Sequence, residues 1–227
     1  MPYTYETKHT AVHQSSRANF GHTGNPTGIT IHHWGLDGQS HDGVVQYLCS
    51  NRPANPTSAH YVVSAGKVSC IVEPARAAWH AGSAQGNGQT IGIECRPEMS
   101  PGDWATLVEL MSDLEQFYGD LKVYPHNYWS STSCPGRYGP RLNELIAAVN
   151  AENTRRKQST AVKTVTTAPT TTSTKIGDLA QTYFPTEVTW AVDKGLMTLR
   201  KGQFEPFATV SRQDLAIILN RMNKKGL

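Results

Sequence analysis

Alternating apolar and polar side chains along residues 29–34, ITIHHW, predict the strand around which the rest of the chain is organised. Strict alternation over a short run is typical of a strand with two different faces. Ile29 and Ile31 lie on one of these faces, and His32 lies on the other, at the end of the strand. Open α/β sheets usually place their chemistry at such strand ends, although a single histidine there is more often a structural residue than a ligand.

A second alternating run, residues 90–95 with the sequence TIGIEC, predicts another strand of the same kind. Ile91 and Ile93 lie on one face of it, so Glu94 lies on the opposite face. A carboxylate on that face, beside a glycine that leaves room, has the geometry of a site residue. A surface glutamate on an edge strand explains the same pattern, and the alternation by itself leaves both interpretations open.

Two short apolar runs and one loop complete the first half of the chain. Residues 61–63 and 68–72 flank an Ala-Gly pair, which predicts a β-hairpin. Residues 77–90 are rich in glycine, serine and asparagine and are expected to form a loop that carries Trp79 and His80. Loops of this kind on a rigid scaffold often line a binding site.

Apolar residues at helical spacing predict three helices in the first two thirds of the chain, over residues 41–51, 101–118 and 140–151. The middle helix has the clearest boundaries, because Ser100 can cap its first turn and Gly119 is a natural stop. Its apolar stripe has the width of a core-facing surface. Strands and helices therefore alternate, which is typical of the α/β class.

Composition divides the chain into three parts. Residues 1–151 form the first domain, which begins with a polar, turn-rich arm over residues 1–27. Residues 152–175 are Thr-rich with almost no large apolar side chains, so they cannot bury enough surface to fold and are expected to be a linker. Apolar periodicity returns over residues 176–227, which predicts a small, mainly helical second module.

Charge and hydropathy exclude several classes of protein. The 227 residues carry a net charge of +3 without a concentrated Lys/Arg stripe, so a nucleic acid is not an expected partner. No run of about 18 apolar residues is present, so membrane insertion is not expected. The N-terminal sequence has no basic region followed by an apolar stretch, which predicts synthesis in a cytoplasm without a secretory signal. In that compartment the four cysteines are expected to stay reduced.

A downstream segment, HNYWSSTSCPG, changes the interpretation of the strand-end histidine. In it His126 and Cys134 bracket a short polar turn, and imidazole and thiolate are ligands that zinc prefers. Together with His32 they make three protein ligands, which leaves a fourth position open, as in catalytic zinc sites. A different chemistry also fits these residues, with Cys134 as a nucleophile and His126 as its base.

From about residue 27 to residue 151 the chain resembles the zinc-dependent N-acetylmuramoyl-L-alanine amidases, the amidase-type phage lysozymes and the peptidoglycan recognition proteins. Five segments carry the resemblance in the order in which those families have them, and the last places a histidine and a cysteine eight positions apart. The segments are ITIHHWG, SAHYVVSAGKV, AAWHAGS, TIGIE and HNYWSSTSCPGRY. The resemblance implies a central mixed β-sheet flanked by helices.

The resemblance also implies roles for individual residues. The zinc ligands would be His32, His126 and Cys134. Glu94 aligns with the carboxylate that acts as general base in many bacterial and phage members. Thr132 falls where some members have a catalytic lysine and the recognition proteins often have threonine.

Three further residues are expected to contact the substrate, namely Trp34, Trp79 and His80, the last two in the families' Trp-His-Ala-Gly loop. His80 or Thr132 could also donate a hydrogen bond to the developing oxyanion. This chain departs from several relatives in having Ala59 where they have a catalytic tyrosine. With neither that tyrosine nor a lysine at position 132, proton transfer is expected to depend on Glu94.

The second module, residues 176–227, resembles one S-layer homology repeat over the segments VTWAVDKGLM and GQFEPFATVSRQDLAIILNRM. The usual glycine in the middle of the repeat is replaced near Thr198, and the usual Thr-Arg-Ala-Glu motif is SRQD. Such repeats commonly occur in threes and bind wall polymers. A single copy implies either a weak anchor to a wall polymer or an element for self-association.

The expected function is hydrolysis, by zinc-activated water, of the amide bond between N-acetylmuramic acid and L-alanine in bacterial peptidoglycan. The order of parts fits a phage endolysin that is made in the host cytoplasm without a signal peptide and acts at the cell wall to lyse the host. A bacterial autolysin exported by another route is one alternative. A peptidoglycan-binding module without catalysis, like recognition proteins that have lost their metal ligands, is another.

Overall fold

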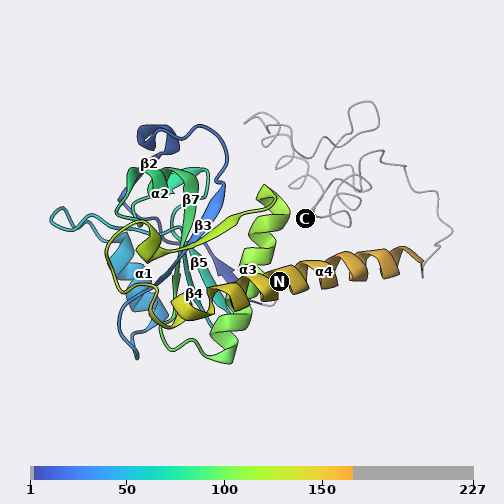
Figure 1. Cartoon of the computed structure of the whole chain (residues 1–227). Helices are drawn as coiled ribbons and strands as arrows, with labels where there is room; N and C mark the ends of the chain where they lie inside the picture. The colour runs from blue at the N-terminus through green and yellow to red at the C-terminus, as the bar shows by residue number, and fades with distance from the viewer. Residues whose placement is uncertain (1–2, 166–227) are drawn as a thin grey trace, which may run out of the picture. The chain divides into compact units, whose positions relative to one another are not determined.

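The strand predicted around ITIHH is β3, one of the inner strands of a six-stranded mixed sheet (Figure 1). The computed structural model describes the backbone of residues 3–165 and the side chains of residues 3–158. The sheet has the order β1-β5-β4-β7-β3-β8, and each neighbouring pair is parallel except the predicted hairpin of β4 and β5. Its strands are β1 (Thr4–Glu6), β3 (Gly28–His33), β4 (Tyr61–Ser64), β5 (Lys67–Cys70), β7 (Thr90–Cys95) and β8 (Lys122–Pro125).

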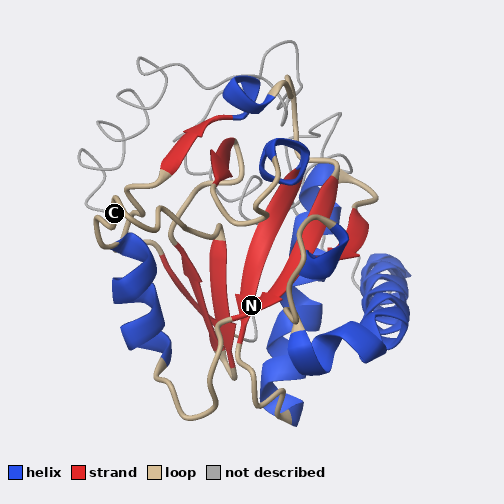
Figure 2. Cartoon of the chain, turned by 60° about the vertical axis from the view of Figure 1, so that its left-hand side comes forward, coloured by secondary structure: helices blue, strands red, loops and turns tan. Residues whose placement is uncertain are grey.

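Helices cover both faces of this sheet (Figure 2). The α-helices are α1 (His41–Cys49), α2 (Ala84–Gln89), α3 (Pro101–Tyr118) and α4 (Leu142–Val165). Short 3-10 helices are η1 (Arg17–Phe20), η2 (His126–Tyr128) and η3 (Gly136–Arg141). The predicted class, a central mixed sheet flanked by helices, is therefore confirmed.

The predicted alternation in β3 and β7 separates a core face from a polar face. The isoleucines of both strands are fully buried and share one cluster with apolar residues of α3 and α4. The opposite face carries His32 and Glu94, which are partners in the parallel register of the two strands. Further along that face, Val62 of β4 packs against α1 in a second cluster. The sheet thus buries one face for stability and leaves part of the other for side-chain chemistry.

Helix α3 begins and ends where the sequence predicts. The hydroxyl of Ser100 accepts a hydrogen bond from the backbone N–H of Asp103 at 3.2 Å, and the Asp103 carboxylate accepts from the backbone N–H of Ser100 at 2.8 Å. This reciprocal capping satisfies two of the backbone donors that a helix N-terminus leaves free. Gly119 follows the last turn with a φ of 82°, a conformation that favours glycine.

Helix α4 is longer than predicted, because it continues to Val165 instead of ending near residue 151. The first half of the predicted linker is thus helical. Arg156 explains part of this, since its guanidinium pairs with Asp113 at 2.6 Å and with Glu152 at 2.7 Å and also contacts Glu109. The pairs with Asp113 and Glu109 connect α4 to α3, and the pair with Glu152 lies within α4. The segment itself has no apolar stripe from which the helix could be predicted.

The Gly-rich segment expected to be a loop contains a strand and a helix. Residues 76–78 form β6 (Arg76–Ala78), which pairs with β2 (Gln14–Ser16) of the N-terminal arm, and α2 follows. Ser83 caps α2 by accepting a hydrogen bond from the N–H of Gly86. A Cβ atom at Gly86 would lie 2.5 Å from the Cβ of Ala81, so glycine permits this close approach. Because glycine is unfavourable inside helices, the same residue makes α2 difficult to predict from the sequence.

No helix in the described part of the chain is long and apolar enough to cross a lipid bilayer. The remainder of the predicted linker and the predicted module at residues 176–227 lie outside the described residues.

Candidate metal centre

Three side chains converge at the carboxyl ends of β3 and β8. His32 is on β3, His126 begins η2 directly after β8, and Cys134 follows in the next loop. One potential ligand atom from each lies within 4.8 Å of the other two. Because β8 pairs with β3 in parallel, both strands deliver their next residues to the same edge of the sheet. The three predicted ligands are therefore neighbours in space.

The hydrogen bonds of the two imidazoles leave one nitrogen of each ring facing this cluster. Nε2 of His126 bonds to the hydroxyl of Ser130 at 3.1 Å, and its Nδ1 is buried without a hydrogen-bond partner among the described residues. Nε2 of His32 bonds to Nδ1 of His80 at 2.9 Å, and Nδ1 of His32 lies 3.8 Å from the sulfur of Cys134. A buried acceptor without a partner is costly. A cation at this point would satisfy it, so the donor set fits zinc.

Cys134 is held against the end of β3 by its backbone environment. The backbone N–H of His33 donates to its sulfur at 3.4 Å, and the hydroxyl of Thr132 accepts a hydrogen bond from the backbone N–H of Cys134 at 3.1 Å. Burial, together with the carboxylate of Glu94, raises the pKa of the Cys134 thiol to about 12. A nucleophilic cysteine needs the opposite shift, so this environment disfavours the cysteine-hydrolase hypothesis.

Glu94 lies beside the three ligands on the adjacent strand. Its Cα pairs with that of His32 in the β3–β7 register, so both side chains leave the sheet on the same face. Burial raises the pKa of its carboxyl to about 7, and its Oε2 is buried without a hydrogen-bond partner in the described part of the structure. A carboxyl with this pKa is suited to take up and release a proton near neutral pH.

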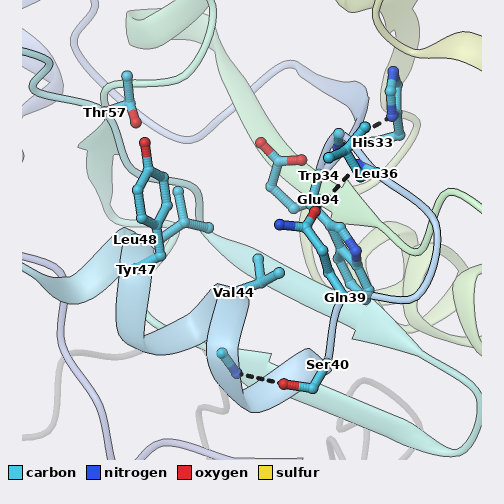
Figure 3. A pocket seen from close by; sticks show the side chains of 12 residues that line it. His33, Trp34, Leu36, Gln39, Ser40, Val44, Tyr47, Leu48, Thr57 and Glu94 are labelled. Carbon is cyan, nitrogen blue, oxygen red and sulfur yellow. Dashed lines mark hydrogen bonds between the residues drawn. The ribbon is translucent and has the colours of Figure 1, made fainter.

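A pocket of about 690 Å³ opens beside Glu94, between β7, the β3–α1 loop and helix α1. Figure 3 shows the Glu94 carboxyl directed into this pocket. Its walls include Trp34, Leu36, Tyr47 and Leu48, and the first three are at least partly exposed. We call this space the α1 pocket.

A second pocket, of about 470 Å³, lies on the side of His126. Trp79 and Ser130 line it, and Thr57 lines both pockets. Two of the residues predicted to contact substrate, Trp34 and Trp79, thus occupy different pockets beside the cluster. The third, His80, also lines the second pocket, although it is only 7% exposed and its Nδ1 is hydrogen-bonded to Nε2 of His32.

Two further residues, which the sequence did not single out, support this cluster. Ser130 lies four positions after His126, which is the spacing of one helical turn, and this spacing was a usable signal. The side-chain oxygen of Asn87 accepts from the backbone N–H groups of His80 and Ala81, at 2.9 and 2.7 Å. No local pattern predicts that contact, because it depends on how α2 folds back.

Comparison with solved structures finds proteins with the same fold. The catalytic domain of XlyA is similar over 64% of this chain and 99% of that domain, with 24% identity and a TM-score of 0.52. A mutant endolysin from Bacillus subtilis is similar over 65% of this chain and 99% of its own, with 26% identity and a TM-score of 0.52. The Staphylococcus aureus hydrolase AmiA, in complex with its ligand, covers 70% of this chain and 87% of its own, with 16% identity and a TM-score of 0.56.

The first and third of these likenesses concern the fold alone, since their identities are below 25%. No curated protein matches the chain in sequence. Residues 22–137 match the family described as N-acetylmuramoyl-L-alanine amidase (Amidase_2), and this range contains the three clustered side chains and Glu94. The chain therefore belongs to the N-acetylmuramoyl-L-alanine amidase family.

Proposed function

We propose that this protein is a zinc-dependent peptidoglycan amidase that cleaves the bond between the lactyl group of N-acetylmuramic acid and L-alanine. The observation that carries the proposal is the convergence of His32, His126 and Cys134 within 4.8 Å, beside the carboxyl of Glu94. Zinc held at such a site supplies a Lewis acid that polarises a carbonyl oxygen and lowers the pKa of water. The family assignment supports the reaction, and the donor set supports the metal.

Glu94 is the proposed general base. Its carboxylate takes a proton from the attacking water and later gives it to the departing amino group of alanine, so the C–O bond forms, the C–N bond breaks and no net proton is lost. Its Oε2 has no other partner among the described residues, so it is available to the water.

Thr132 is the proposed oxyanion donor. Its hydroxyl oxygen accepts the backbone N–H of Cys134, and this leaves the hydroxyl proton free to be donated to developing negative charge. Trp34 and Trp79 are the proposed substrate contacts, because they line the pockets on either side of the cluster.

The decisive experiment measures release of new N-terminal alanine from purified peptidoglycan, with chelator and then with zinc added back. Release that the chelator stops and zinc restores is the expected result. Release that persists under chelation, and is abolished by thiol alkylation, would instead establish a cysteine hydrolase. No release from a protein that still sediments with peptidoglycan would establish a binding module.

We infer further that the protein acts at the cell wall as a phage endolysin. Similarity to the Bacillus subtilis endolysin supports this setting. Residues 176–227 are proposed to bind a wall polymer or to associate with a second copy. Sedimentation of the full chain alone and with purified walls distinguishes these roles. An autolysin would be favoured if the producing bacterium exports this protein by another route and the protein then lyses cells only from outside.

A further inference from the structure

His80 lies directly behind His32, on the side away from Cys134. The two rings meet edge to face, with centroids 5.0 Å apart and planes at 90°, and Nδ1 of His80 is 2.9 Å from Nε2 of His32. The side chains are 7% and 2% exposed, so water does not compete for this hydrogen bond. A bond between two buried imidazoles has a direction, because one nitrogen must donate and the other must accept.

The direction of this bond decides whether His32 can bind a metal. Nδ1 of His32 faces the sulfur of Cys134 at 3.8 Å, so Nδ1 is the atom that the metal site can use. It is a ligand only when the ring proton is on Nε2, and Nε2 then donates to Nδ1 of His80. If His80 donated instead, the proton of His32 would be on Nδ1 and would block ligation.

We propose that His80 is a positioning residue, which accepts the Nε2 proton of His32 and so fixes both the ring orientation and the tautomer that presents Nδ1 to the metal. The inference rests on the proposed function, because it assigns a role at the same zinc site. It gives the His80 side chain a task other than substrate contact or oxyanion donation. Partners of this kind typically contribute a factor of 10 to 100 to metal affinity.

His80 can do this because its own position is fixed from three sides. Its backbone N–H donates to the side chain of Asn87 at 2.9 Å, and the ring of His60 packs against it with centroids 5.6 Å apart. On the third side it lies close to Gly92 of β7, where an added Cβ atom would be 2.4 Å from the Cγ of the ring. The glycine beside Glu94 therefore makes room for His80.

The other histidine of the cluster provides an internal comparison. Nε2 of His126 bonds to the hydroxyl of Ser130 at 3.1 Å, so its Nδ1 also faces the site. A hydroxyl rotates and both donates and accepts, so it constrains the imidazole less than a fixed ring nitrogen does. We therefore expect Ser130→Ala to reduce zinc affinity less than removal of the His80 acceptor.

The test measures zinc affinity of the full chain by competition with a chromophoric chelator. His80→Phe keeps an aromatic ring but removes the acceptor, and it should weaken zinc binding about 10- to 100-fold. His80→Asn places an amide oxygen near the position of Nδ1 and should restore most of that loss. The matched control is His41→Phe, at another buried histidine that bonds to Ser64 and Ser69 and should leave zinc affinity unchanged.

Wild-type affinity in a folded His80→Phe protein would overturn the inference and leave the proposed function intact. A wild-type chain that binds no zinc would overturn the proposed function and the inference with it. A measurement without any variant covers the case in which His80→Phe does not fold. In ¹⁵N-labelled, zinc-loaded wild type, a scalar coupling across the hydrogen bond between Nε2 of His32 and Nδ1 of His80 is expected. Its absence, or a proton on Nδ1 of His32, would refute the assignment.

Discussion

The two faces of strands β3 and β7 differ in what they contribute to the molecule. On one face four isoleucines are fully buried beneath α3 and α4, and burial of each contributes about 1.5–3 kcal/mol to the free energy of unfolding. On the other face His32 and the Oε2 atom of Glu94 are buried, which costs free energy unless each polar atom finds a partner. The same six-residue strands thus supply stability on one side and the proposed reactive groups on the other, and each side can be perturbed separately.

The largest expected effect is on the reactive face. Glu94→Gln keeps the shape of the side chain but removes the proton acceptor, so alanine release should fall about 10²- to 10⁴-fold while bound zinc stays the same. Turnover on purified peptidoglycan and zinc content per chain are the measurements. Glu144→Gln, on the exposed start of α4, is the control. Turnover of Glu94→Gln equal to wild type would remove Glu94 from the mechanism.

The corresponding change on the core face should act on stability instead. Ile93→Ala leaves a cavity under α3, and the free energy of unfolding should fall by about 2–5 kcal/mol. Urea unfolding of the metal-free protein measures this loss, and a zinc titration of the folded variant should match wild type. If zinc affinity instead fell as far as in His32→Ala, the two faces would not be separable.

Acid should lower the free energy of unfolding through buried histidines on the polar side of the sheet. Burial, reinforced by the charge of Lys67, lowers the pKa of His41 to about 4, against the opposing effects of Asp42 and Glu6. Below pH 6.5, the ordinary pKa of this histidine, His41 binds a proton in the unfolded chain but not in the folded protein. The stability contribution is therefore complete above pH 6.5 and is lost as the pH falls toward 4, by up to about 3 kcal/mol.

Urea titrations of metal-free protein at pH 7 and pH 4.5 measure this effect. Between these two pH values the free energy of unfolding should change less in His41→Gln than in wild type. Other buried histidines account for the pH dependence that His41→Gln retains. An identical pH dependence in both proteins would show that His41 does not contribute.

The smallest expected effects distinguish the two pockets. Trp34→Ala should raise the KM for a soluble muropeptide roughly tenfold, which corresponds to about 1.4 kcal/mol, with a smaller change in kcat. Trp79→Ala tests the other pocket with the same truncation. Steady-state kinetics on both variants would show which pocket contributes more to binding, and unchanged KM values in both would place the substrate elsewhere.

Local patterns predicted the parts of this fold that local forces determine. The alternation in ITIHH and TIGIE gave both strands and the faces of His32 and Glu94, and Ser100 and Gly119 gave the ends of α3. Turn chemistry gave the hairpin of β4 and β5. The clustering of His126 and Cys134 with His32 came from ligand chemistry and resemblance, since a spacing within one segment cannot show which distant strand it will meet.

Features that depend on contacts distant in sequence were missed. Helix α4 continues past residue 151 with help from ion pairs of Arg156, and α2 forms because glycines let it pack closely against Ala81. His80 was expected at the substrate, and this expectation stays a prediction because His80 lines the second pocket. Its hydrogen bond to His32, which the sequence did not predict, is shown only by the three-dimensional arrangement. The sequence of this loop is compatible with a His80 side chain that contacts the substrate and with one that contacts His32, so the segment alone does not distinguish the two positions.

The parallel register that pairs His32 with Glu94 limits how these strands can change over evolutionary time. One residue inserted into β3 ahead of His32 would turn the histidine into the core and an isoleucine into the active-site face together. Two inserted residues would restore the faces but move the histidine roughly 7 Å along the strand, out of step with the carboxylate. Point replacements therefore change one face at a time, whereas a one-residue change of length in either strand disturbs the core and the polar face together. Variation in length must be absorbed by the loops.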